Sequence, residues 1–275
     1  MLGGFMERLL GVSIALVAVV TLSAQVVRRG EASPIAPEIT LYDYPGVIVG
    51  VPIAIQQGQY LDTCNCPPFT GGSGSGIMAG VFYELPSEKH SLVRLGISAG
   101  IDYRRLVSSY RQQELVSFVS SDGAQRFDDV PVEFRQQATF SFFGLWAQPY
   151  VRFVPFASDI VAFGLGTDLG FLLNGTVQHT KSLTQNTVRL PNGETLSLRM
   201  PDGSSSTTIR DGDIIGLKRF QASLAFRIES SFRLSEQWYL RPGMQYRLPL
   251  TDVSASGMKV AAWMLTLALT HRGER

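Results

Sequence analysis

Residues 91–104 read SLVRLGISAGIDYR, and their side chains alternate between two kinds. Every second position is apolar: Val93, Leu95, Ile97, Ala99, Ile101 and Tyr103. The positions between them are charged or small: Arg94, Gly96, Ser98, Gly100, Asp102 and Arg104. Successive side chains of a β-strand point to opposite faces, so this stretch predicts a strand with one apolar face and one polar, narrow face.

The same alternation recurs along the chain and predicts eight strands: 46–55, 75–85, 91–105, 138–154, 159–174, 216–234, 238–250 and 258–271. Short connections at 86–90, 155–158 and 235–237 alternate with long ones at 56–74, 106–137 and 175–215, and 251–257 is intermediate. This arrangement is typical of outer-membrane barrels. We therefore predict an all-β fold, an eight-stranded antiparallel transmembrane β-barrel with short periplasmic turns and long extracellular loops.

A bilayer explains why the two faces differ so strongly. No water pairs the backbone N–H and C=O groups in lipid, so a sheet there must close on itself. Tyr83 and Trp238 fall near the short-turn ends, while Tyr103, Tyr246 and Trp263 fall near the long-loop ends, which predicts two aromatic girdles. A soluble lipocalin-like barrel also alternates. The polar face here is rich in Gly, Ser and Ala rather than Lys and Glu, which favours the membrane barrel.

The alternation also predicts faces and register. We expect Leu165 to face lipid and Gly164 to face the lumen. A three-residue loop at 235–237 places Phe232 opposite Leu240. The turn at 155–158 sets two pairs that cover a track of glycines with aromatic rings: Tyr150 opposite Gly164, and Trp146 opposite Asp168. In the third long loop, Asn192-Gly193 lies between strand-like runs and predicts a β-hairpin.

The amino-terminal segment predicts export. Residues 9–22 read LLGVSIALVAVVTL, follow Arg8 and precede Ser23-Ala24, which is the pattern of a secretory signal peptide. An uncleaved anchor is the alternative. We expect a cleaved signal peptide over 1–24, a periplasmic lead-in over 25–45, the barrel over 46–271 and a tail over 272–275, located in the bacterial cell outer membrane.

The chain resembles small eight-stranded outer-membrane β-barrel proteins, the superfamily around OmpX and the OmpA barrel. The stretch CPPFTGGSGSGIMAGVFYELPS at 66–87 looks like their loop-into-second-strand segment, and the resemblance spans roughly residues 46–271. The chain departs from that superfamily in ending ALTHRGER, without a terminal aromatic residue. It also lacks the peptidoglycan-binding domain of OmpA proteins, so the resemblance does not imply that activity.

A set of charged residues falls on the predicted inner face: Glu84, Arg94, Asp102, Arg104, Arg152, Asp168, Arg227, Glu229, Arg233, Arg241 and Arg247. They are interpreted either as the lining of a selective pore or as a self-paired network that plugs the lumen. An eight-stranded barrel is only wide enough for its own side chains, which favours the plug.

The cysteines and histidines give weaker signals. Cys64 and Cys66 are one residue apart in the first long loop, and an exported location favours a local disulfide between them. Two cysteines with no histidine near in sequence are too few for a closed zinc site. Pairing with another chain is the remaining alternative. His90, His179 and His271 form no His-x-Ser motif on a strand, so we interpret them as solvated surface residues and expect no catalytic, cofactor or metal site.

The composition argues against one class of partner, nucleic acid. The formal net charge of +1 offers no basic surface for nucleic acid. We expect a monomer surrounded by outer-membrane lipid, not an enzyme, with a surface ligand bound by its long loops in adhesion, surface protection or partner binding. A narrow passive channel of the porin kind and a lipid-modifying enzyme of the outer leaflet are the alternatives.

Overall fold

The computed structural model describes residues 40–274 except 63, 65, 89–90, 120–124, 157–159, 191–192 and 201–202. The predicted signal peptide, most of the predicted lead-in and His90 therefore lie outside the described residues. Within the described part of the chain, no helix has the length and hydropathy that crossing a membrane requires.

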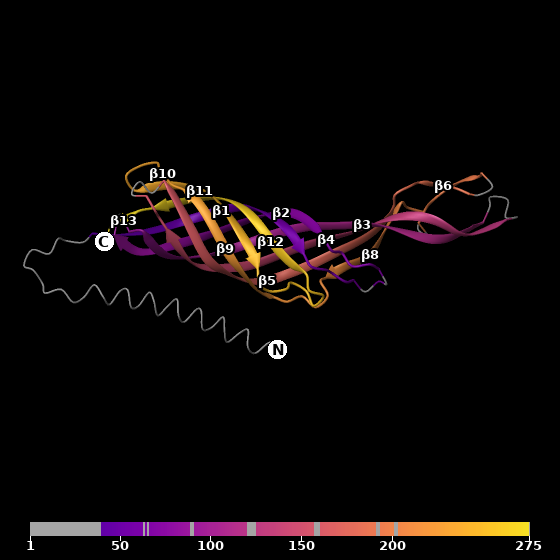
Figure 1. Cartoon of the computed structure of the whole chain (residues 1–275), viewed down its shortest axis with the longest axis horizontal. Coiled ribbons are helices and arrows are strands. Elements are labelled where there is room, and N and C mark those ends of the chain that lie inside the picture. The colour runs from indigo at the N-terminus through magenta and orange to yellow at the C-terminus, as the bar shows by residue number, and fades with distance from the viewer. Residues whose placement is uncertain are drawn as a thin grey trace, which may run out of the picture. The chain divides into compact units, whose positions relative to one another are not determined.

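Eight long strands form a closed ring (Figure 1): β1 (Leu41–Gln57), β2 (Gly72–Glu88), β3 (Val93–Val119), β4 (Arg126–Phe153), β5 (Val161–Leu183), β9 (Phe220–Ser230), β11 (Trp238–Pro249) and β12 (Lys259–His271). Each pairs antiparallel with the next, and β12 pairs with β1 to close the barrel. The shorter strands are β6 (Thr187–Arg189), β7 (Thr195–Ser197), β8 (Ser206–Asp213), β10 (Phe232–Arg233) and β13 (Gly273–Glu274). The predicted eight-stranded antiparallel barrel is confirmed, although β1 starts at Leu41, earlier than predicted.

The outside of the barrel is apolar. On β1 the outward side chains of Val47, Val49 and Val51 are 50–52% exposed, while Ile48 between them is 2% exposed. Residues 47–55, rising about 3.3 Å each and tilted by about 45°, cover about 20 Å of height, comparable with the ~25 Å apolar band of membrane barrels. Leu165 is 53% exposed and faces outward, as predicted. This surface is that of a transmembrane β-barrel.

Inside the barrel, aromatic rings cover glycines of β2 and β3 rather than the predicted glycine track at 164–170 of β5. A Cβ atom on Gly80 would lie 2.8 Å from the indole ring of Trp146, and one on Gly96 would lie 2.5 Å from the ring of Tyr150. These separations are below van der Waals contact, so a side chain at either glycine would displace the ring. The close approach of ring to backbone fills the narrow lumen.

One predicted register is right and one is wrong. Phe232 lies opposite Leu240, as predicted. Tyr150 pairs with Gly166 rather than Gly164, and Trp146 pairs with Gly170 rather than Asp168. The connection between β4 and β5 runs from 154 to 160, longer than the predicted turn, and it shifts the register by two residues. A two-residue shift keeps every side chain on its face, which is why the predicted faces hold.

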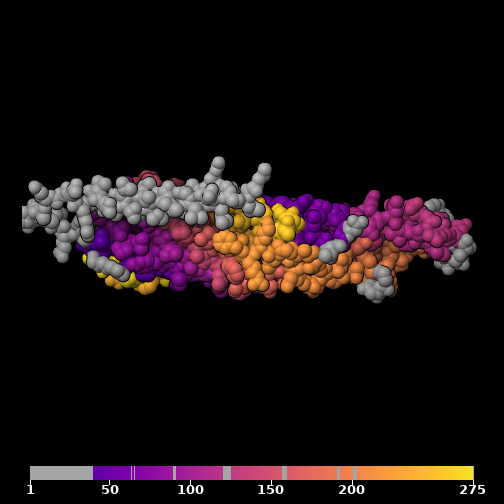
Figure 2. Space-filling view, turned by 90° about the horizontal axis from the view of Figure 1, so that it is seen from below, coloured from indigo at the N-terminus to yellow at the C-terminus, as the bar shows by residue number. Residues whose placement is uncertain are grey.

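β3 and β4 continue past their neighbours as a two-stranded arm, defined here as residues 113–119 and 126–133. The last β3 partner of β2 is Ser108, and the first β4 partner of β5 is Phe134. The prediction of a loop over 106–137 is therefore wrong, because residues 106–119 of β3 pair with residues 126–140 of β4. The seven β3 residues of the arm, at about 3.3 Å each, give a length of about 23 Å. Figure 2 shows its residues in magenta at one end of the barrel.

The third long connection is also ordered into strands. β6 pairs antiparallel with β7, which confirms the predicted hairpin, although Asn192 itself lies outside the described residues. Gly193 has a φ of +89°, and its amide donates to the Leu190 carbonyl at 2.9 Å. A positive φ is the conformation that glycine adopts without strain, which explains its place in this turn. Leu198 and Met200, just beyond β7, pack on Val132 and Phe134 of β4, so the connection supports the base of the arm.

Candidate functional site in the lumen and at its mouth

A first group of charges, the turn-side cluster, lies near the short-turn end of the lumen. It consists of Glu84, Arg152, Glu229 and Arg241, one residue each from β2, β4, β9 and β11, and all are buried. Arg241 Nη1 donates to Glu84 Oε1 at 2.6 Å, and Arg152 Nε donates to Glu229 Oε1 at 2.5 Å. Arg152 Nε also lies 3.8 Å from Glu84 Oε1. These ion pairs join strands that are not hydrogen-bonded neighbours in the barrel wall.

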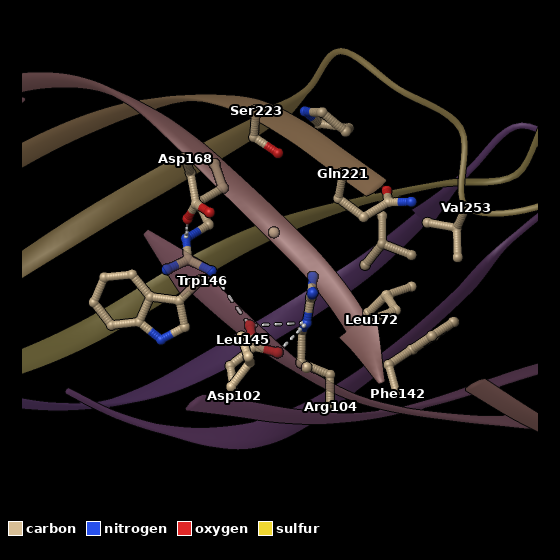
Figure 3. Close-up of a pocket in the computed structure, with 15 residues that line it drawn as sticks. Asp102, Arg104, Phe142, Leu145, Trp146, Asp168, Leu172, Gln221, Ser223 and Val253 are labelled. Carbon is tan, nitrogen blue, oxygen red and sulfur yellow. Dashed lines mark hydrogen bonds and ion pairs between the residues drawn. The ribbon is translucent and has the colours of Figure 1, made fainter. Parts of the chain in front are cut away.

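A second group, the loop-side cluster, lies closer to the long loops and consists of Asp102, Arg104, Asp168 and Arg247. Arg247 Nη1 lies 3.3 Å from Asp102 Oδ2, and Arg247 Nε lies 2.5 Å from Asp168 Oδ2. Arg104 Nε lies 3.2 Å from Asp102. Figure 3 shows Asp102 and Asp168 on the two sides of a small space beside Trp146. One arginine thus bridges two carboxylates, and the Arg247 guanidinium stands 5.4 Å from the Trp146 ring centre.

Amide side chains form further hydrogen bonds in the lumen. Arg227 Nε donates to Gln245 Oε1 at 2.9 Å, and Gln245 Nε2 donates to Gln148 Oε1 at 3.1 Å. Arg94, 1% exposed, stacks over the Tyr44 ring with its guanidinium 4.5 Å from the ring centre. Arg233 does not belong to the lumen, contrary to prediction. It is exposed at the end of β10 and donates to the Ser235 carbonyl, because the strand leaves the barrel wall there.

Little space remains between these side chains. The cavity beside the loop-side cluster, lined by Asp102, Asp168 and Arg247, has a volume of about 30 Å³. A second one, next to Arg152 and Glu229, has a volume of about 10 Å³. One water molecule needs a cavity of roughly 10–15 Å³, so these two cavities can hold only isolated water molecules.

An apolar group of side chains, the apolar cap, lies at the loop-side mouth and was not predicted. Tyr60 and Phe69, from the β1–β2 connection, pair through two backbone hydrogen bonds of 2.9 Å. They pack with Phe140 of β4 and with residues from the last two long connections, Ile214, Leu217, Val253 and Met258. Burial and the charge of Asp62 raise the pKa of Tyr60, so its phenol stays neutral. The aromatic residues of the β1–β2 connection are the sequence feature from which this apolar cap could have been predicted.

His179 is a buried residue at the mouth, and its prediction as a solvated loop residue is wrong. β5 extends to Leu183, so the strand directs this ring inward, where it is 0% exposed. Its Nδ1 lies 2.7 Å from Asp62 Oδ2, and its Nε2 lies 3.0 Å from Gln136 Oε1. The other described histidine, His271, packs against Trp238, with the centres of the two rings 5.1 Å apart.

Next to this ring is the cysteine pair. In the structure Cys64 and Cys66 form a disulfide whose Cα atoms are 5.1 Å apart. Cys64 Sγ lies 4.0 Å from His179 Nδ1, so the pair adjoins the buried histidine rather than standing alone at a loop tip. Nothing in the sequence indicated this contact, because Cys64 and His179 are 115 positions apart.

Comparison with solved structures finds similarities at low sequence identity. Neisserial surface protein A is 12% identical, over 83% of this chain and 96% of its own, with a TM-score of 0.33. Ail, the attachment invasion locus protein of Yersinia pestis, solved with the heparin analogue sucrose octasulfate, is 13% identical over 84% of this chain and 99% of its own, with a TM-score of 0.29. The outer membrane protease OmpT from Escherichia coli is 7% identical over 89% and 99%, with a TM-score of 0.27.

No family model and no curated protein sequence matches the chain. At TM-scores below 0.5 the structural likenesses decide no function. The barrel itself is established by the strand pairing described above.

Proposed function

We propose that this chain is an integral outer-membrane protein whose lumen is closed by its own charges and whose activity resides on the loop-side surface. The activity is adhesion, surface protection or binding of a surface partner, without catalysis. The chain acts as a monomer whose barrel is surrounded by outer-membrane lipid.

The surface supports the location. A closed sheet leaves no unpaired edge in the barrel wall, and its outward side chains are those of an apolar band. Short connections at one end and long ones at the other match barrels of the bacterial outer membrane. The signal peptide expected from the sequence provides the route of export.

The pairing of the lumen charges carries the proposal of a closed lumen. Arg241 and Arg247 each bind carboxylates from other strands, and the cavity between Asp102 and Asp168 has a volume of only about 30 Å³. An ion crossing the barrel would have to separate these buried pairs, at a cost of several kcal/mol for each uncompensated charge. The apolar cap is a second barrier at the mouth.

The arm supports a function on the surface. Its two strands continue for about 23 Å past the last residues that pair with β5. Leu115 is 67% exposed and Val119 is 56% exposed on one face of the arm, although neither meets lipid there. A paired ribbon that extends past the barrel presents these side chains to a partner on a firmly held surface.

Conductance tests the closed lumen. We expect folded wild-type protein in a planar lipid bilayer to give no reproducible unitary current steps, because the buried ion pairs and the apolar cap both obstruct the path. Different migration of heated and unheated samples in detergent gels verifies that the protein applied is folded. Reproducible steps from folded protein would instead establish the narrow channel.

Shortening the arm tests the role of the surface. Replacing residues 115–131 by Asn-Gly leaves Glu114 and Val132, which are cross-strand partners, on either side of a two-residue turn. We expect the barrel to fold normally and the bacterium to lose the adhesion or serum resistance that the wild-type chain confers. Leu115→Ser in the full-length arm is the matched variant, and it should weaken the same property. Full retention of the property by the shortened chain would contradict the proposal.

A further inference from the structure

Three different ligand types converge where the β1–β2 connection meets β5. A carboxylate oxygen of Asp62, the sulfur of Cys64 and a ring nitrogen of His179 all lie within 4.8 Å of one another. Oxygen, sulfur and imidazole nitrogen are the ligands that Zn²⁺ takes in proteins, at 2.0–2.3 Å from the ion. Three protein ligands with one remaining coordination position are a common arrangement for zinc.

The surroundings orient two of these ligands. Gln136 Oε1 accepts a hydrogen bond from His179 Nε2 at 3.0 Å, which directs Nδ1 toward Asp62 and Cys64. A metal-binding histidine usually donates its other ring N–H to such an acceptor. His179 Nδ1 lies 2.7 Å from Asp62 Oδ2, so these two atoms are close enough to bind the same ion.

Arg210 affects this group of ligands in two opposite ways. Arg210 Nη1 lies 3.3 Å from Asp62 Oδ1, and its positive charge disfavours a nearby cation. Its side chain is 24% exposed, so water screens it partly, and it contacts the oxygen that points away from His179. It therefore holds the Asp62 carboxylate in place while Oδ2 faces the other two ligands.

The disulfide decides whether the third ligand is available. A metal binds the thiolate form of cysteine, and Cys64 is bonded to Cys66 in the structure. The converging set contains the sulfur of Cys64 but not that of Cys66. Two molecules of a small thiol would reduce this bond, leaving two protein thiols and one external disulfide. The closed ring spans a single residue, so its loss costs the fold little.

We propose that reduction of the Cys64–Cys66 disulfide creates a zinc site formed by Asp62, Cys64 and His179. The loop then has two alternative states, an oxidised one closed by the disulfide and a reduced one that binds the metal. This inference departs from the absence of a metal site expected from the sequence, because a histidine distant in sequence supplies the missing ligand.

Two single variants separate the site from non-specific binding. Cys66→Ser and Cys64→Ser both remove the disulfide and leave one thiol, but only Cys66→Ser keeps all three ligands. We expect folded Cys66→Ser to bind one Zn²⁺ per chain in competition with a fluorescent chelator, without any reductant. Cys64→Ser should bind at least tenfold more weakly, a loss within the range known for disturbed zinc sites. Oxidised wild type should bind as weakly as Cys64→Ser.

Reduced wild type provides a measurement that depends on no variant. Thiol titration of denatured, unreduced protein should find no free thiol. After reduction by a phosphine and its removal, zinc binding should equal that of Cys66→Ser. With Co²⁺ in place of Zn²⁺, a sulfur-to-metal absorption band should appear in Cys66→Ser and be absent in Cys64→Ser. Equal zinc binding by the two variants, or no gain on reduction of the wild type, would overturn the proposal.

Discussion

Replacing Glu84 by glutamine should lower the free energy of unfolding by about 3 kcal/mol, near the lower end of the 3–5 kcal/mol typical for removing one partner of a buried ion pair. Glu84 is 1% exposed and accepts a hydrogen bond from Arg241 at 2.6 Å. Glutamine keeps the shape and one acceptor oxygen but leaves the Arg241 charge uncompensated in the lumen. Urea unfolding of the barrel in lipid vesicles, followed by tryptophan fluorescence, measures the change.

Two further variants test whether the uncompensated charge of Arg241 causes this loss of stability. Glu88→Gln makes the same change at an exposed position on the same strand, and its effect should stay within about 0.5 kcal/mol. Glu84→Gln combined with Arg241→Gln removes both charges and should recover most of the lost stability, because the orphaned cation is gone. If Glu84→Gln is as mild as Glu88→Gln, the turn-side cluster does not hold the barrel together.

The membrane-spanning strands could be predicted because a single physical constraint shapes them. Lipid outside and a narrow lumen inside impose strict alternation on every strand, as in 91–104, and this pattern is readable without a structure. The arm escaped prediction because no lipid enforces alternation beyond the membrane. Val132 and Phe134 of β4 do alternate with polar residues, and they are covered by residues that follow β7, a contact that only the fold reveals.

The inner charges were predictable as a group but not as pairs. Alternation places Glu84 and Arg241 on the lumen side, yet which arginine meets which carboxylate depends on strand tilt and register across the barrel. The β4–β5 register shows the difficulty, since a shift of two residues changed every partner while leaving the faces intact. His179 and Asp62 were missed because their contact joins a loop to a strand 117 positions away.

Leu165→Arg should destabilise the barrel by about 2–4 kcal/mol, the cost of an arginine that faces lipid near the middle of the membrane. Leu165 is 53% exposed on β5, between Val151 of β4 and Phe226 of β9, which are also outward and apolar. A guanidinium at this depth must either leave water or thin the bilayer around it. Reversible folding into vesicles under a urea gradient gives the difference from wild type.

Leu115→Arg is the control that isolates lipid as the cause. Leu115 is also a strand leucine and is even more exposed, at 67%, but it lies on the arm, where the surrounding medium is water. An arginine there should change the free energy of unfolding by no more than about 0.5 kcal/mol, as surface substitutions usually do. Similar small effects at both positions would mean that water surrounds the barrel, as in a soluble lipocalin-like fold. A large effect at Leu165 alone requires hydrocarbon around the barrel, because residue type and secondary structure are matched and both side chains are more than half exposed.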